Sequence, residues 1–188
     1  MMSAIVSLKE DHRAIRHVLD ILHVITERME LGDPVSPSVL QSILDFMVNF
    51  KEITHRGRED IVFLPLLSRR EVQRPSAVDL VMAEHEKERR LIQEFQQAVN
   101  RYDVDDASSR LKVVQVARKL RTLLDAHVSK EEDILLPWAE RLLTPQVDME
   151  LIQKIEKIGP SFVRETSAYV DDIARRAWNS YRLLHVQA

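Results

Sequence analysis

Two stretches of the sequence decide how the chain folds: 55-HRGREDIVFLP-65 and 127-HVSKEEDILLP-137. They align without a gap, and each has glutamate four positions after the histidine, an acidic residue at the fifth position and Leu-Pro at the ninth and tenth. Residues four apart in an α-helix lie one above the other on one face. His55 can therefore reach the same small volume as Glu59. The same holds for His127 and Glu131.

These stretches are parts of a longer internal repeat. His12 precedes His55 by 43 positions, and His85 precedes His127 by 42. An acidic residue also stands directly before the first histidine of each half. A single His-x-x-x-Glu is weak evidence, because it occurs by chance on surface helices, but two matching blocks at nearly equal distances from a preceding histidine are much more specific. The repeat predicts one site built from two equivalent halves.

The rest of the chain has the spacing of helices. Apolar residues recur every three or four positions, which predicts an all-α protein without a β-sheet. Proline, glycine and capping residues divide the pattern into helices at about 3–30, 37–64, 76–102 and 109–136, and into a final segment after Thr144-Pro145 that Gly159-Pro160 divides. We therefore expect an up-down-up-down four-helix bundle at 1–145. Residues 146–188 form an additional C-terminal helical segment, which either packs on the bundle or mediates a homodimer contact.

The histidines and glutamates of the repeat lie on the faces of the helices that are expected to point inward. On the first helix the inward stripe is Ile5, Leu8, His12, Ile15 and Leu19; on the second it is Leu44, Val48, Glu52, His55, Glu59 and Val62; on the third Val78, Val81, His85, Glu88, Ile92, Phe95 and Val99; and on the fourth Leu120, Leu124, His127, Glu131 and Ile134. Antiparallel packing brings these polar positions toward a common centre.

Buried carboxylates are unfavourable unless they are paired, protonated or bound to metal. Two dications at the centre would supply the missing charge, and imidazole with carboxylate suits iron, manganese or zinc. The predicted metal ligands are His12, His55, Glu59, His85, His127 and Glu131. The sequence does not decide the role of two further glutamates, Glu52 and Glu88. Each is an added metal ligand, an acceptor that orients an imidazole, or a side chain that extends into solvent. His17, His23 and His185 fall outside the repeat and are expected to be ordinary surface or core residues.

The composition excludes several other classes of site. The chain of 188 residues has no cysteine, so it holds no disulfide, cysteine-ligated zinc, iron–sulfur cluster or thiol nucleophile. Its formal charge of −3 provides no basic face for nucleic acid. No stretch approaches the ~18 apolar residues of a membrane-spanning helix, and the first residues lack the pattern of a signal peptide. We therefore expect a cytoplasmic protein with neither a nucleic-acid nor a membrane partner.

The inward histidines of four helices and the two His-x-x-x-Glu blocks resemble the hemerythrin, or HHE cation-binding, family over roughly residues 3–140. The resemblance implies a hemerythrin-like bundle that holds two iron ions, with an oxo or hydroxo bridge, in preference to manganese or zinc. It implies that His12 and His55 bind one iron and that His85 and His127 bind the other. By the same resemblance, both Glu59 and Glu131 bridge the two irons.

One position departs from the oxygen-carrying hemerythrins, whose third helix has a second histidine four residues after the first; Arg89 stands there instead. The four-histidine, two-glutamate set is closer to hemerythrin-like domains linked to iron or oxygen sensing and to stress responses that repair nitrosatively damaged iron centres. The leading hypothesis is a non-haem di-iron protein that binds or senses dioxygen, peroxide or nitric oxide. The alternatives are an enzyme that decomposes peroxide or reduces nitric oxide or oxygen, and a bundle in which metal is structural or stored.

Overall fold

The computed structural model describes residues 3–68, 77–158 and 163–185, and within these ranges the chain forms helices without a β-strand. The elements are α1 (Ala4–Leu31), α2 (Pro37–Asp45), the π-helical η1 (Phe46–His55), α3 (Arg56–Leu67), α4 (Ala77–Asn100), α5 (Ala107–Lys130), the π-helical η2 (Glu131–Leu135), α6 (Leu136–Glu140), α7 (Pro145–Ile158) and α8 (Val163–His185). Among the described helices, none combines the length and the apolar character needed to cross a lipid bilayer.

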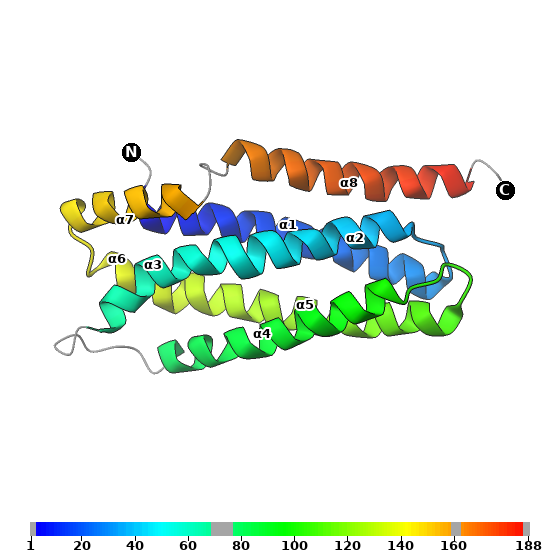
Figure 1. Ribbon diagram of the computed structural model, residues 1–188, viewed down its shortest axis with the longest axis horizontal. Helices are drawn as coiled ribbons and strands as arrows, with labels where there is room; N and C mark the ends of the chain where they lie inside the picture. The colour runs from blue at the N-terminus through cyan, green and yellow to red at the C-terminus, as the bar shows by residue number, and fades with distance from the viewer. Residues whose placement is uncertain (1–2, 69–76, 159–162, 186–188) are drawn as a thin grey trace.

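The predicted four-helix bundle is confirmed. Figure 1 shows α1, the rod made of α2, η1 and α3, then α4, and then α5 with η2 and α6, running in alternating directions. The close neighbours are α4 with α5 and α1 with α5. The two C-terminal helices lie along the outside of this bundle, with α7 against α3 and α1, and α8 against α1 and α2 (Figure 1).

Capping residues explain where the helices begin and end. The Oγ of Ser3 accepts the backbone N–H of Val6 at the start of α1. Gly32 ends α1 in the left-handed conformation, with φ of 94°. Asp106 begins α5 by accepting the N–H groups of Ser108 and Ser109, so this helix starts two residues before the predicted position. The predicted start of the third helix at Ser76 lies outside the described residues.

Two helices continue three or four residues beyond the approximate ends that were predicted at prolines. The helix expected to stop before Pro65 continues to Leu67, and the helix expected to stop near Pro137 continues to Glu140. Proline removes one N–H donor, but the residues around these prolines are buried in the core, among them Leu66 and Trp138. Tertiary packing therefore carries both helices past the break that the local sequence indicates.

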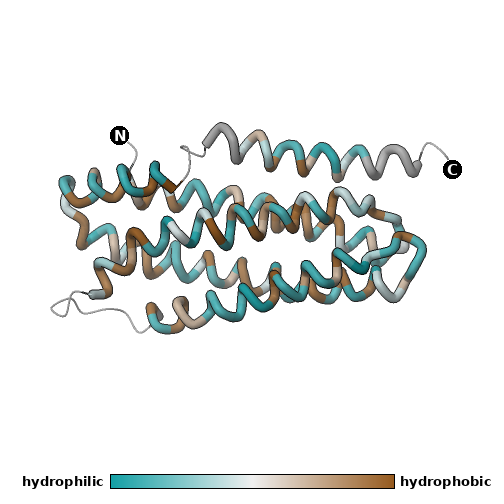
Figure 2. The backbone as a smooth tube through the Cα atoms, viewed as in Figure 1, coloured by the Kyte–Doolittle hydropathy of each residue, from teal (hydrophilic) through white to brown (hydrophobic). Residues whose placement is uncertain are grey.

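Apolar residues recur along the helices of the bundle and alternate with hydrophilic ones (Figure 2). Inside, they form two separate clusters. The larger contains residues such as Ile15, Leu22, Phe46, Phe95 and Leu124; the smaller contains residues such as Leu8, Val62, Val81, Leu135 and Trp138. Between the clusters lies a polar layer, since each of the four bundle helices changes there from apolar to ionisable buried residues.

Helices α7 and α8 belong to this core. Leu151 and Ile155 of α7 are buried in the smaller cluster, and Val170 and Ile173 of α8 are buried in the larger one. The C-terminal segment thus covers the apolar residues on both sides of the polar layer.

The π-helical segments shift the inward stripes by one residue. In the second helix, the predicted Val48 and Glu52 are only partly buried, whereas Met47 and Lys51 are fully buried. In the fourth helix, the predicted Ile134 is exposed and Leu135 is buried. A π-turn adds a residue to each helical turn, so the α-helical period used for the prediction fails next to η1 and η2.

We predict that Gly32→Ala lowers the free energy of unfolding by about 1–2 kcal/mol, because an L-side chain is strained in the left-handed conformation that ends α1. No atom lies within 4 Å of the site of an added Cβ, so the loss would come from the backbone alone. Gly32→Asn is the matched control and should lose less, since asparagine tolerates this conformation. Urea denaturation measures both variants, and equal stability of Gly32→Ala and the parent would contradict the prediction.

Candidate metal centre

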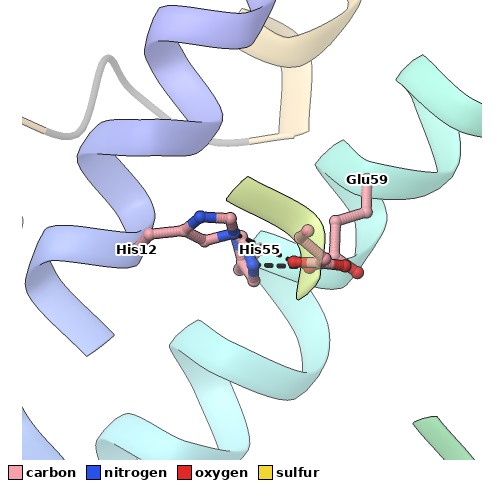
Figure 3. A group of neighbouring side chains, drawn as sticks. His12, His55 and Glu59 are labelled. Carbon is pink, nitrogen blue, oxygen red and sulfur yellow. Dashed lines mark ion pairs between the residues drawn. The ribbon is translucent and has the colours of Figure 1, made fainter. Parts of the chain in front are cut away.

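The six side chains predicted as ligands lie together in the polar layer, and each is at most 1% exposed. They form two sets whose candidate ligand atoms all lie within 4.8 Å of one another: one set is His12, His55, Glu59 and Glu131, and the other is Glu59, His85, His127 and Glu131. Both glutamates belong to both sets. Figure 3 shows part of the first set, with His12 on α1 facing His55 and Glu59 from the α2–η1–α3 rod.

Each glutamate directs one oxygen toward each histidine pair. Oε1 of Glu59 lies 2.5 Å from Nε2 of His55, and its Oε2 lies 3.1 Å from Nε2 of His85. Oε2 of Glu131 lies 3.0 Å from Nε2 of His12, and its Oε1 lies 3.3 Å from Nε2 of His127. A carboxylate in this arrangement can share its two oxygens between two ions.

The chemistry of the donor atoms fits metal ions. In spite of these short distances, the Nε2 atom of all four histidines and both oxygens of both glutamates are buried without a hydrogen bond of acceptable geometry. Buried polar atoms are nearly always satisfied, so eight orphans in one volume need an explanation. Nitrogen and oxygen lone pairs that face a shared point, rather than each other, are what coordination of a metal requires.

In both halves of the repeat, an acid–cation pair contacts the Nδ1 atom of the second histidine. Nδ1 of His55 lies 3.2 Å from Oδ2 of Asp11, whose Oδ1 accepts from Nη1 of Arg58 at 2.8 Å. In the second half, Nδ1 of His127 lies 3.2 Å from Oε2 of Glu84, whose other oxygen accepts from Lys130. An acceptor on Nδ1 fixes the ring and leaves Nε2 free for a metal.

The remaining two histidines differ from each other. Nδ1 of His12 lies 3.2 Å from Oε1 of Glu132, whose Oε2 accepts from Nη2 of Arg16 at 3.0 Å. Nδ1 of His85 is buried and has no hydrogen-bond partner among the described residues. The two halves are therefore alike at His55 and His127 but not at the two histidines that begin them.

The charges in the layer shift one another's pKa values strongly. Burial opposes the charged form of His55, but Glu59 and Asp11 outweigh it and raise the pKa of His55 to about 10. Burial likewise opposes the charged form of Glu131, yet His12 and His127 lower its pKa to about 2, and the pKa of Glu59 lies well below its ordinary value chiefly because of His55. The carboxylates are thus ionised at neutral pH and need positive charge beside them, from a bound proton or from a metal.

The same pattern is found in known proteins. The Hemerythrin HHE cation binding domain matches residues 3–139, which is well over half of the chain. The chain belongs to this hemerythrin family. No curated protein and no solved structure matches it significantly. As a member of the hemerythrin family, the chain combines a cation-binding domain with two buried histidine–glutamate clusters of the kind that hold metal ions.

Glu52 and Glu88, whose roles the sequence did not decide, have different surroundings in the structure. Glu52 is partly buried: its Oε1 accepts from Nε of Arg89 at 2.9 Å, and its Oε2 is buried without a hydrogen-bond partner among the described residues. Arg89, at the position of the extra histidine of the oxygen-carrying hemerythrins, is exposed. Glu88 is fully buried, pairs with Lys51 and lies 3.1 Å from Nδ1 of His127. Neither glutamate is a member of the two clusters.

Sequence reasoning missed Lys51 and the cations, Arg58 and Lys130, that complete the acid–cation pairs. The pairs had a signal in the repeat, because Arg58 and Lys130 each stand three residues after the second histidine of their half. Lys51 had none, since its burial depends on the π-turn. Of the histidines outside the repeat, His17 is exposed and His23 is partly exposed beside Glu27, at 3.4 Å; the side chain of His185 lies outside the described residues.

We predict that His55→Ala and Glu131→Ala each lower the metal content of the purified protein, because each removes a donor from the shared volume. His23→Ala is the matched control and should retain the parent's metal content, since this histidine lies on the outer face of α1. Elemental analysis of the three variants and the parent makes the comparison. Equal metal content in all four would refute the ligand assignment.

We also predict that raising the pH weakens the metal-free protein. His55 binds a proton more tightly in the folded chain, with a pKa of about 10, than in the unfolded chain, where its ordinary value is 6.5. This stabilising contribution is fully present below pH 6.5 and is lost as the pH rises toward 10. Urea midpoints of metal-free protein should therefore fall between pH 6.5 and 9.5, and less so for His55→Ala; parallel pH profiles for the two proteins would contradict this.

Proposed function

We propose that this chain is a non-haem di-iron protein whose metal centre binds or senses a small ligand such as dioxygen, peroxide or nitric oxide. The observation that carries the proposal is the sharing of Glu59 and Glu131 between two histidine pairs. In this proposal His12 and His55 anchor one ion, His85 and His127 anchor the other, and the two carboxylates span both. Iron is preferred over manganese or zinc because of the resemblance to the hemerythrins, and the donor set is compatible with it.

The protein's own residues would keep the centre rigid and partly open. The acid–cation pairs Asp11–Arg58 and Glu84–Lys130 orient His55 and His127, so the imidazoles need no rearrangement when a ligand binds. Two histidines and two shared carboxylates per ion leave coordination positions unfilled, as in other non-haem iron sites that bind small molecules. Two adjacent irons, when bound, would supply those positions and a change of oxidation state.

The surroundings of the site favour a small and weakly polar ligand. The two apolar clusters close the polar layer from both ends of the bundle, and α7 and α8 cover them from outside. A large polar substrate would have to displace this packing, whereas a diatomic molecule or peroxide would not. These observations support binding of a gas or peroxide over hydrolysis of a larger substrate.

The deciding experiment is elemental analysis with an optical spectrum of freshly purified protein, before and after dioxygen, peroxide and nitric oxide. We predict about two irons per chain, in line with two donor sets, and near-ultraviolet to visible bands of a bridged iron pair that change when a ligand is added. Glu59→Gln is a suitable comparison, because it keeps the shape of a shared carboxylate and removes its charge.

The possible results separate the alternatives. Colourless protein that contains zinc would refute the di-iron proposal and favour a structural or storage role. Sustained gas evolution from peroxide by iron-loaded protein would favour the hypothesis of a peroxide-decomposing enzyme. Stoichiometric binding without turnover would favour the hypothesis of a binding or sensing protein.

A further inference from the structure

One buried ion pair beside the metal centre has no role in the proposed ligand set. Lys51 on η1 and Glu88 on α4 are both 0% exposed, and Nζ of Lys51 donates to Oε2 of Glu88. The other oxygen of Glu88 lies 3.1 Å from Nδ1 of His127 but has no hydrogen bond of acceptable geometry. The pair thus lies against the histidine pair formed by His85 and His127.

Holding the helices together does not explain this ion pair. Burying two charges is unfavourable, and an apolar pair of similar volume is often equally stable or more stable. The chain has apolar residues at the positions that match this pair in the repeat: the buried Ile15 stands three residues after His12, as Glu88 does after His85, and Leu123 stands four residues before His127, as Lys51 does before His55. Among the described residues, an ion pair occupies these positions only beside His85 and His127.

The charge balance around the site points to an anion. Four acidic side chains outside the two clusters contact the cluster histidines, and each forms an ion pair with a basic side chain. The pairs are Asp11–Arg58, Glu84–Lys130, Glu132–Arg16 and Glu88–Lys51. These surroundings are neutral as a whole. Two dications held by two carboxylates would leave two positive charges inside a buried layer. A hydroxo bridge would match one of them, and a negatively charged ligand would reduce the remaining excess.

Lys51 is placed to contribute to this preference. In the metal-free chain, burial opposes its charged form, but Glu88, Glu59 and Glu131 outweigh burial and raise the pKa of Lys51. The direct ion pair with Glu88 holds the ammonium group beside the site. An ammonium group has three N–H donors. In the part of the chain that the structure describes, Glu88 is the acceptor for one of them.

We propose, on the basis of the dinuclear centre proposed above, that Lys51 is a specificity-determining residue that favours a small anion over a neutral diatomic ligand at this centre. The anion belongs to the class of azide and hydroperoxide, which are small enough for the layer. Glu88 moderates the preference by sharing the ammonium group. The two partners of one ion pair therefore have opposite effects on anion affinity.

The test is a titration of iron-loaded protein with azide, followed by its optical bands, with nitric oxide as the neutral probe. Lys51→Met should weaken azide binding by roughly tenfold or more, as expected for the loss of one nearby charge in a poorly screened site. Glu88→Gln should strengthen azide binding several-fold, because it removes a nearby negative charge and frees the ammonium group. Nitric oxide affinity should change by less than about twofold in both variants.

A double variant separates charge from folding. Lys51→Leu with Glu88→Ile removes both charges and places two apolar residues there, so it should unfold at a midpoint close to the parent's, and its azide affinity should lie between those of Lys51→Met and Glu88→Gln. Metal content is measured first in every variant. Parent protein without two metal ions would overturn the proposed function and this inference together.

Two other results would overturn the inference and leave the proposed function standing. The first is unchanged azide affinity in metal-loaded Lys51→Met. The second is an equal loss of azide and nitric oxide affinity in both single variants, because a purely structural ion pair would act on the two probes alike and in the same direction for either partner.

Discussion

The burial of two carboxylates, those of Glu59 and Glu131, is the constraint on which the rest of the structure depends. Both side chains are 1% exposed, and both stay ionised in spite of burial. Charges of this kind are unfavourable in an apolar core unless positive groups face them closely. The four helices each supply an imidazole to the same layer, and the two apolar clusters confine that layer to one level of the bundle. The bundle is thus organised around a polar centre, with hydrophobic packing on either side of it.

The internal repeat explains how a single chain builds such a centre, and its differences show where the two metal positions become unequal. The halves agree where an acid and a cation orient the second histidine. They differ at Nδ1 of the first histidine, which has Glu132 in one half and no described partner in the other. They differ again where Lys51 and Glu88 occupy one side and apolar residues the other. A two-fold repeat with unequal neighbours can hold two like ions in unlike surroundings.

Most of the fold and all six convergent residues could be predicted from the sequence, because the relevant signals are local. Spacing of four residues within a helix, repeated at nearly equal distances, is enough to place two His-x-x-x-Glu blocks and two further histidines at one level of a bundle. The ends of the helices at Pro65 and Pro137 could not be predicted in this way, since packing of distant residues carries both helices past the prolines. Lys51 was missed for a related reason: nothing in its own sequence neighbourhood indicates that the helical period changes there.

The two π-helical segments show why the period changes next to the site and not within it. Both His-x-x-x-Glu blocks keep the α-helical spacing that lets histidine and glutamate reach one volume, because η1 ends at His55 and η2 begins at Glu131. π-Turns are rare and are frequently found at functional sites. Because the extra residue lies outside the His-x-x-x-Glu blocks, the spacing of the candidate ligands is preserved. The residues that face the adjoining core are shifted by one position. In the first half that reset brings Lys51 inward beside the carboxylates, and in the second it brings Leu135 into the smaller apolar cluster. The same backbone device therefore has a polar consequence on one side of the centre and an apolar one on the other.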